Sequence, residues 1–153
     1  MDSYAAIQQS PAYMIISLVC AIIGIVASWK IFTKAGEKGW KAIIPVYNGY
    51  TSFKLFWNVK MFWITLVLAL ALGICVGIAG VAGAMGSMIA FYVSMIAYLV
   101  IVVVMLVVSV IHTHRISKSF GHGAGFTVGL IFLSIIFVLI LAFGKSEYKK
   151  LED

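Results

Sequence analysis

The chain has 153 residues, of which 63% are hydrophobic and only 10% are charged. A soluble domain of this length needs a charged surface that this composition cannot supply, so we expect a membrane protein. The net charge of +6 does not indicate nucleic acid as a partner. The basic residues lie beside the apolar stretches, where Lys and Arg anchor membrane helices and set their orientation.

Long stretches without charge predict four transmembrane helices. A bilayer core about 30 Å thick is crossed by roughly 20 apolar residues in a helix. No Asp, Glu, Lys or Arg occurs from Phe62 to Ile111, which is enough for two spans. We therefore predict an all-α polytopic membrane protein, a single domain over residues 1–153, with spans at about 11–33, 61–84, 88–112 and 125–143, a cytoplasmic amphipathic loop at 34–60 and a polar tail at 144–153.

The ends of the first predicted span carry recognisable signals. The segment before Pro11 contains no Lys or Arg, so we interpret the span as an uncleaved helix and not as a signal peptide. Pro11 suits a first helical position, with Ser10 as the N-cap. At the other end, Gly36 is typical of the glycine that stops a helix.

The positions of the basic residues predict the orientation. Six Lys lie in the loop after the first span or, as Lys30 does, in the last turn of that span, and the loop between the third and fourth spans holds Arg115 and Lys118. An even number of spans places both loops on one side of the membrane. The positive-inside rule then predicts that both loops are cytoplasmic and that both termini lie outside.

Small residues recur at four-residue intervals in and beside three of the predicted spans. Such ladders allow helix backbones to approach closely in lipid. We interpret them as packing between the helices of one chain, with seams between identical chains as the alternative. The residues are Cys20, Gly24 and Ser28, then Ala69, Gly73 and Gly77, then Gly121, Gly125 and Gly129.

The residue types do not point to an enzyme. The chain has five acidic residues, and no paired-carboxylate site, nucleophile elbow, zinc-protease motif or phosphate loop is present. His112 and His114 would point about 200° apart on a helix, so we predict neither a metal site nor a cofactor. We expect His114, Arg115 and Lys118 to meet lipid headgroups or cap the helix. Cys20 and Cys75 are predicted as free thiols inside spans.

The loop after the first span contains two short amphipathic patterns. Trp40, Ile43, Ile44 and Tyr47 share one helical face, and Pro45 should end that helix near Ile44. Asn48 is then predicted to cap a second segment. We favour two pieces that lie flat on the inner membrane surface. The alternative is a re-entrant or cavity-lining turn, which requires cover by protein or water.

Two segments carry a resemblance. The stretch "WKIFTKAGEKGWKAIIPVYNGY", Trp29–Tyr50, and the stretch "SFGHGAGFTVGLIFLSIIFVLILAFGKSEY", Ser119–Tyr148, resemble the signature of an uncharacterised family of small bacterial membrane proteins. The pattern is roughly W-K-x-[FY]-x-K-A-G-x-x-G-W-x-x-x-I-P-x-Y-N, with an FG-x-G-x-G-F…FG-x-S-x-Y ending. Members of that family are often labelled signal peptidase I. Ser134 departs from the pattern, which has Pro there, so we expect a straighter fourth helix.

The resemblance implies a bacterial inner-membrane protein and a set of binding positions. These positions are Trp29, Lys30, Lys34, Gly36, Gly39, Trp40, Pro45, Tyr47, Asn48, Phe120, Gly121, Gly125, Phe143, Gly144, Ser146 and Tyr148.

Three functions remain open on these residues. The first is a non-enzymatic scaffold or accessory subunit that binds a protein partner, a second copy of itself or anionic lipid headgroups of the bilayer. The second is a small channel or transporter, in which Tyr92, Ser94, Tyr98 and Ser109 could line a wet path. The third, implied by the resemblance, is an accessory module related to signal-peptidase-like proteins.

Overall fold

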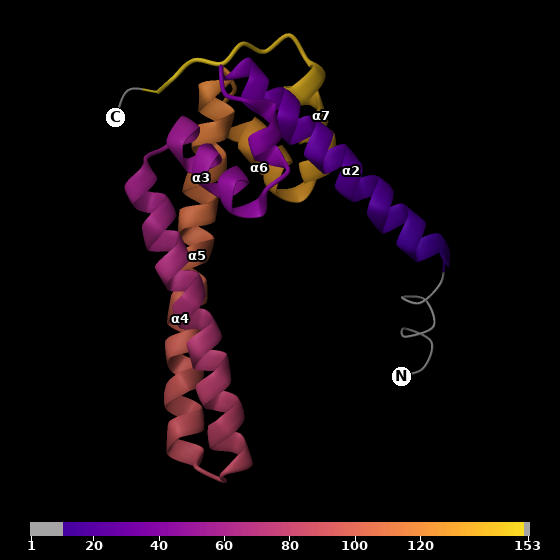
Figure 1. Ribbon diagram of the computed structural model, residues 1–153. Helices are drawn as coiled ribbons and strands as arrows, with labels where there is room; N and C mark the ends of the chain where they lie inside the picture. The colour runs from indigo at the N-terminus through magenta and orange to yellow at the C-terminus, as the bar shows by residue number, and fades with distance from the viewer. Residues whose placement is uncertain (1–10, 152–153) are drawn as a thin grey trace.

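A computed structural model describes residues 11–151, and that part of the chain is helical, without strands (Figure 1). Ser10 and the rest of the leader lie outside the described residues, so the predicted N-cap does too. The elements are α2 (Pro11–Lys34), η1 (Gly39–Ala42), α3 (Pro45–Phe56), α4 (Val59–Ala84), α5 (Met88–Ser119), α6 (Ala124–Phe132) and α7 (Ser134–Phe143).

Three of these helices, α2, α4 and α5, are long and apolar enough to cross a membrane. Helices α4 and α5 pack on each other as a long antiparallel hairpin, whereas α2 packs on η1 and α7 (Figure 1). The predicted first three spans are therefore confirmed as helices. The third helix continues past residue 112 to Ser119, so its last two turns project into the head described next.

The remaining elements form a compact head at one end of the long helices. The head consists of the C-terminal end of α2, η1, α3, α6, α7, the tail, and the ends of α4 and α5 that adjoin them (Figure 1). Eight of its buried apolar side chains form one cluster. They are Ala27, Ile31, Phe32, Ala42, Phe56, Phe120, Leu141 and Ala142.

Glycine ends both helices that enter the head. Gly36 has φ +79°, the Glu37 N–H donates to the Phe32 carbonyl at 2.8 Å, and the Gly36 N–H donates to the Thr33 carbonyl at 3.1 Å. This pair of bonds is the Schellman arrangement. It requires a left-handed backbone conformation at Gly36, which glycine adopts without steric cost. Gly121, with φ +75°, ends α5 in the same way. The predicted helix stop at Gly36 is confirmed.

The predicted fourth span, 125–143, is not one helix. It is divided at Leu133 into α6 and α7, of 9 and 10 residues. At 1.5 Å per residue each is about 15 Å long or less, roughly half of what a bilayer core requires. The two helices fold back on each other. The ring of Phe137 in α7 lies against Gly129 in α6 and packs edge-on to the ring of Phe126, with the ring centroids 4.9 Å apart.

Ser134 stabilises this break although it is not proline. Its hydroxyl donates to the Leu130 carbonyl at 2.7 Å, which gives a partner to a backbone acceptor at the end of α6. Such back-bonding from a helical serine commonly bends a helix. The expectation of a straighter helix at this position is therefore wrong.

The reversal of α6 and α7 changes the predicted position of the tail. The Ser117 hydroxyl at the end of α5 donates to the Gly123 carbonyl just before α6, at 3.0 Å. The Lys149 N–H in the tail donates to the Ser119 carbonyl at 2.7 Å. The tail therefore lies at the same end of the molecule as both loops, whereas four spans would have placed it at the opposite end.

Most glycines of the small-residue ladders do not lie against another helix of this chain. A Cβ added at Gly24, Gly73, Gly77 or Gly125 would meet nothing within 4 Å. Gly129 is the exception, because Phe137 covers it. Seams between identical chains stay a prediction for Gly24, Gly73 and Gly77.

Gly39 is held tightly by Trp29, and this contact yields a test. A Cβ at Gly39 would overlap the indole ring of Trp29. We expect Gly39→Ala to lower the free energy of unfolding by about 1–3 kcal/mol, because the ring must shift out of its packed position. The measurement is thermal unfolding in detergent. Gly24→Ala, with open space around its Cβ, is the matched control and should leave stability unchanged or raise it slightly.

Equal melting temperatures for the two variants would contradict the packed contact between Trp29 and Gly39.

Candidate functional site

The two signature segments meet in the head, where Lys34 contacts Gly144, 110 residues further along the chain. The Lys34 ammonium at the end of α2 donates to the carbonyls of Gly144 at 2.7 Å and Leu141 at 2.9 Å, with Ser146 at 3.5 Å. These carbonyls lie at and just beyond the C-terminus of α7. A cation is favoured there by the helix dipole and by carbonyls that lack a helical partner.

The tail is fastened to the head by Tyr148. Its hydroxyl donates to the Leu55 carbonyl in α3 at 2.7 Å. Its ring packs against Phe56 and Phe120, each with ring centroids 5.9 Å away. Burial raises the pKa of the Tyr148 phenol above its ordinary value, which keeps the donor protonated. Of the predicted positions, Phe120 and Tyr148 are thus in direct contact.

The three histidines are internal hydrogen-bonding groups. His122 lies 2.8 Å from the Ser146 hydroxyl and stacks on Phe126. His114 lies 2.9 Å from the Thr127 hydroxyl, so it joins α5 to α6. One ring nitrogen of His114 is thus occupied by the buried Thr127, and contact of the half-exposed ring with lipid headgroups stays a prediction.

His112 joins α5 to α3. Its ring lies 3.3 Å from the Ser52 hydroxyl and stacks on Phe53 with centroids 4.2 Å apart. Within residues 11–151, no group of three or more His, Cys, Asp or Glu side chains is placed to hold a metal.

Glu37 is surrounded by two lysines from different elements. Its carboxylate accepts from Lys41 at 2.6 Å and from Lys54 at 2.7 Å. The Lys41 and Lys54 ammonium groups lower the pKa of Glu37 from 4.5 to about 2. The hydrogen bond that Lys54 donates to Glu37 also raises the pKa of Lys54. The pair of ion pairs links the turn after α2 to η1 and to α3.

The loop around Pro45 forms two short helical segments that meet near Ile44, as predicted, but the second segment begins at Pro45 and not after Asn48. Residues 39–42 form a single 3₁₀ turn, and Pro45 is the first residue of α3 and not the residue that ends a helix. Proline is favoured there because its fixed φ suits the first turn and its missing N–H is not needed. Asn48 consequently lies inside α3, so it does not cap the helix. Its Nδ2 donates back to the Ala42 carbonyl at 3.2 Å.

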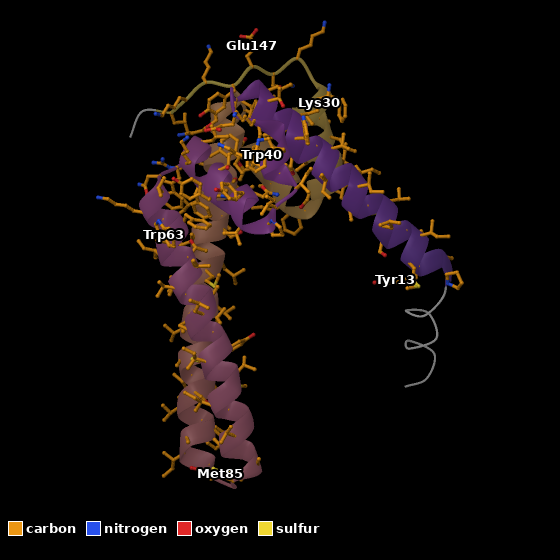
Figure 2. All side chains as sticks on the ribbon, viewed as in Figure 1. Tyr13, Lys30, Trp40, Trp63, Met85 and Glu147 are labelled. Atoms are coloured by element: carbon orange, nitrogen blue, oxygen red, sulfur yellow. The ribbon has the colours of Figure 1, made fainter. Side chains whose placement is uncertain are left out.

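The other predicted loop residues occupy the surface around this turn. Trp40 and Tyr47 pack on each other with ring centroids 5.7 Å apart, and both are exposed. Lys30 lies over the ring of Phe143, 5.6 Å from its centroid. Figure 2 shows Lys30 and Trp40 on the head, far from Met85 at the tip of the α4–α5 hairpin.

A cavity of about 250 Å³ lies where α2, α3, α5, α6 and α7 converge. Asn48 is the one predicted binding residue on its wall, and Ser28, which we had assigned to helix packing, is another wall residue. Three hydroxyl residues that the sequence did not indicate as binding residues also line it: Ser52, Thr113 and Ser134. The departure from the family pattern marks Ser134 alone, and no spacing in the sequence relates it to Ser52 or Thr113. The cavity favours the cavity-lining alternative for the loop.

The head, the three long helices and the reversed pair α6–α7 define a helical membrane protein in which the loop and tail form one folded end. Comparison with family models assigns the chain further. Residues 40–150 match a family of unknown function (DUF5684), and the chain belongs to that family. The segment Trp29–Gly39 precedes the matched range. Neither the curated proteins nor the solved structures contain a significant match.

The Glu37 ion pairs predict acid sensitivity of the head. Because the pKa of Glu37 is lower in the folded protein than its ordinary 4.5, the stabilisation is present above about pH 4.5 and is lost as the pH falls towards 2. Lys54 is half exposed, so we expect an effect of about 1 kcal/mol or less. Unfolding midpoints of the wild type and Glu37→Gln, measured from pH 6 to pH 2.5, should converge at the acidic end. A constant difference over this range would contradict the assignment.

Proposed function

We propose that the protein is a non-enzymatic membrane scaffold or accessory subunit whose head holds anionic lipid headgroups at the inner surface of a bacterial membrane. The observation that carries the proposal is the segregation of charge. All eleven Lys and Arg residues belong to the head or its immediate edge, against two acidic residues, Glu37 and Glu147, among residues 11–151. The rest of α2, and α4 and α5 from Met61 to His114, contain no charged residue.

The reversal of α6 and α7 supports the orientation. With four spans, three lysines of the tail would lie on the side opposite to the other eight basic residues. With the tail on the head, all eleven lie on one side, as the positive-inside rule favours for the cytoplasmic face. We therefore propose that both loops and the tail are cytoplasmic and that the tip of the α4–α5 hairpin lies outside.

Several of the basic side chains are free to meet lipid. Lys34, Lys41 and Lys54 are engaged within the head by carbonyls or by Glu37. By contrast, the side chains of Lys118, Lys145, Lys149 and Lys150 are exposed. Each basic residue near an anionic membrane surface contributes about 1 kcal/mol of attraction.

Cysteine labelling tests the orientation. In a background with Cys20→Ala and Cys75→Ala, single cysteines replace Lys38 in the loop, Lys150 in the tail and Ser87 at the hairpin tip. A membrane-impermeant maleimide added to intact cells should label Ser87→Cys and spare both Lys38→Cys and Lys150→Cys until the membrane is opened. Four spans predict instead that Lys150→Cys is labelled together with Ser87→Cys.

Retention of lipid tests the function. The variant Lys118→Gln, Lys145→Gln, Lys149→Gln should retain less phosphatidylglycerol than the wild type in native mass spectrometry, by about fivefold for each charge. The matched triple Lys→Arg variant keeps the charge and should bind as the wild type does. Binding of the wild type should also weaken in 0.5 M salt, because exposed charges are screened. Equal retention of phosphatidylglycerol and phosphatidylcholine by the wild type would contradict the proposal.

The alternative of a small channel or transporter remains a prediction. The observation in its favour is the cavity that reaches Asn48.

A further inference from the structure

The cavity in the head has an apolar floor and a polar rim. Five of its lining side chains are buried, and all five are apolar: Ile31, Phe32, Phe56, Leu130 and Leu141. Its five polar side chains are partly or fully exposed, and none of them is charged: Ser28, Asn48, Ser52, Thr113 and Ser134. The rim draws these groups from α2, α3, α5 and α7, so only the folded head assembles it.

The rim groups have hydrogen-bonding capacity beyond their bonds within the chain. The Thr113 hydroxyl donates to the Ser109 carbonyl, and the Ser134 hydroxyl donates to the Leu130 carbonyl, so their oxygens still have lone pairs to accept with. Asn48 uses one Nδ2 hydrogen for the Ala42 carbonyl, and the amide has a second N–H and a carbonyl oxygen. The rim therefore offers both acceptors and a donor to a ligand.

The depth of the rim decides what kind of ligand fits. Ser28 and Thr113 each lie six residues before the end of their helix, about 9 Å inward from the basic end of the head. With the basic end of the head at the lipid phosphates, this depth places the rim close to the ester groups of the leaflet, a placement that rests on the orientation proposed above. A charged group at this rim would have no opposite charge on the cavity wall, and its desolvation would be costly.

The size and polarity of the cavity agree on one class of ligand. A volume of about 250 Å³ corresponds to roughly eight waters at about 30 Å³ each, which is the size of a medium-length aliphatic chain. A hydroxyl of the ligand would donate to the rim oxygens, and an ester carbonyl would accept from Asn48. We propose that the cavity binds a neutral acylglycerol, with its glycerol and ester at the rim and its acyl chain on the floor.

This site uses no charged side chain, so its test can be separated from the test of the lipid headgroup binding proposed above. Loss of phosphatidylglycerol retention in the lysine variant would leave it intact, and loss of acylglycerol binding would leave the basic face intact.

Photolabelling in phosphatidylcholine vesicles tests the proposal. A monoacylglycerol with a diazirine in a ten-carbon chain should label the peptides of α2, α3, α6 and α7 that form the floor. Unlabelled monodecanoylglycerol should compete, whereas decanoate, which has the same chain length and a charge, should compete at least tenfold less well. Equal competition by decanoate, or labelling spread evenly over the lipid-facing surfaces of α4 and α5, would overturn the proposal.

Two matched pairs of variants localise the site. Val138→Phe fills the cavity and should reduce labelling of the floor at least tenfold, whereas Val128→Phe changes an exposed valine of α6 that does not line the cavity. Thr113→Val removes a rim hydroxyl and should weaken competition by monodecanoylglycerol about three- to tenfold, the equivalent of one hydrogen bond. Thr65→Val is its control, because Thr65 also bonds the carbonyl four residues earlier but lies on α4.

If Val138→Phe does not fold, the comparison of Thr113→Val with Thr65→Val still tests whether the ligand binds at the rim. Labelling and competition that are the same in Thr113→Val as in Thr65→Val would overturn the assignment of the rim.

Discussion

The bond between the Lys34 ammonium and the C-terminal end of α7 is the interaction on which the arrangement of the head depends. An ammonium group has three donors, and it is placed near the Leu141 carbonyl in the last turn of α7 and the Gly144 and Ser146 carbonyls just beyond it. No carboxylate is needed to stabilise the cation, because the negative end of the helix dipole serves. The bond fixes the C-terminus of α7 beside the C-terminus of α2.

That constraint has a topological consequence. Helix α6 begins beside the end of α5, and α7 must end beside the end of α2. Both points are at the same end of the molecule, so the chain between them has to reverse direction. The break at Leu133 and the back-bonding of Ser134 make this reversal. The tail then begins on the head, where Tyr148 and Lys149 fasten it to α3 and α5. The cavity is the space bounded by these converging elements, and it lies at the border between the charged end and the apolar helices.

The parts of the fold that local chemistry specifies were predictable from the sequence. The uncharged stretches of α4 and α5 are long enough to cross a bilayer, and that length can be read directly from the sequence. Gly36 ends α2 because the backbone there is left-handed, a conformation that favours glycine. The prediction for Asn48 was wrong because a contact outside its own helix determines its role: it has the residue type of a helix cap but bonds Ala42 from within α3. His114 likewise bonds Thr127 in the next helix, a contact that the sequence pattern did not indicate.

The signature segments illustrate the same limit. From the sequence they were candidates for binding, and the structure brings most of them together as contacts that hold the head: Trp29 against Gly39, Lys34 against Gly144, and Phe120 against Tyr148. The rim of the cavity was not predicted apart from Asn48, since its hydroxyls are scattered over four helices and no spacing in the chain relates them.

The sequence by itself determined the membrane class, the three long helices and the concentration of positive charge beside them, because hydrophobic length and charge position act locally on each segment. Only the tertiary structure decided that the last apolar stretch reverses and that the tail joins the basic end. It also decided that five uncharged polar groups surround an apolar cavity. These features depend on hydrogen bonds and packing between segments far apart in the chain, and no local pattern records which carbonyl a lysine will reach.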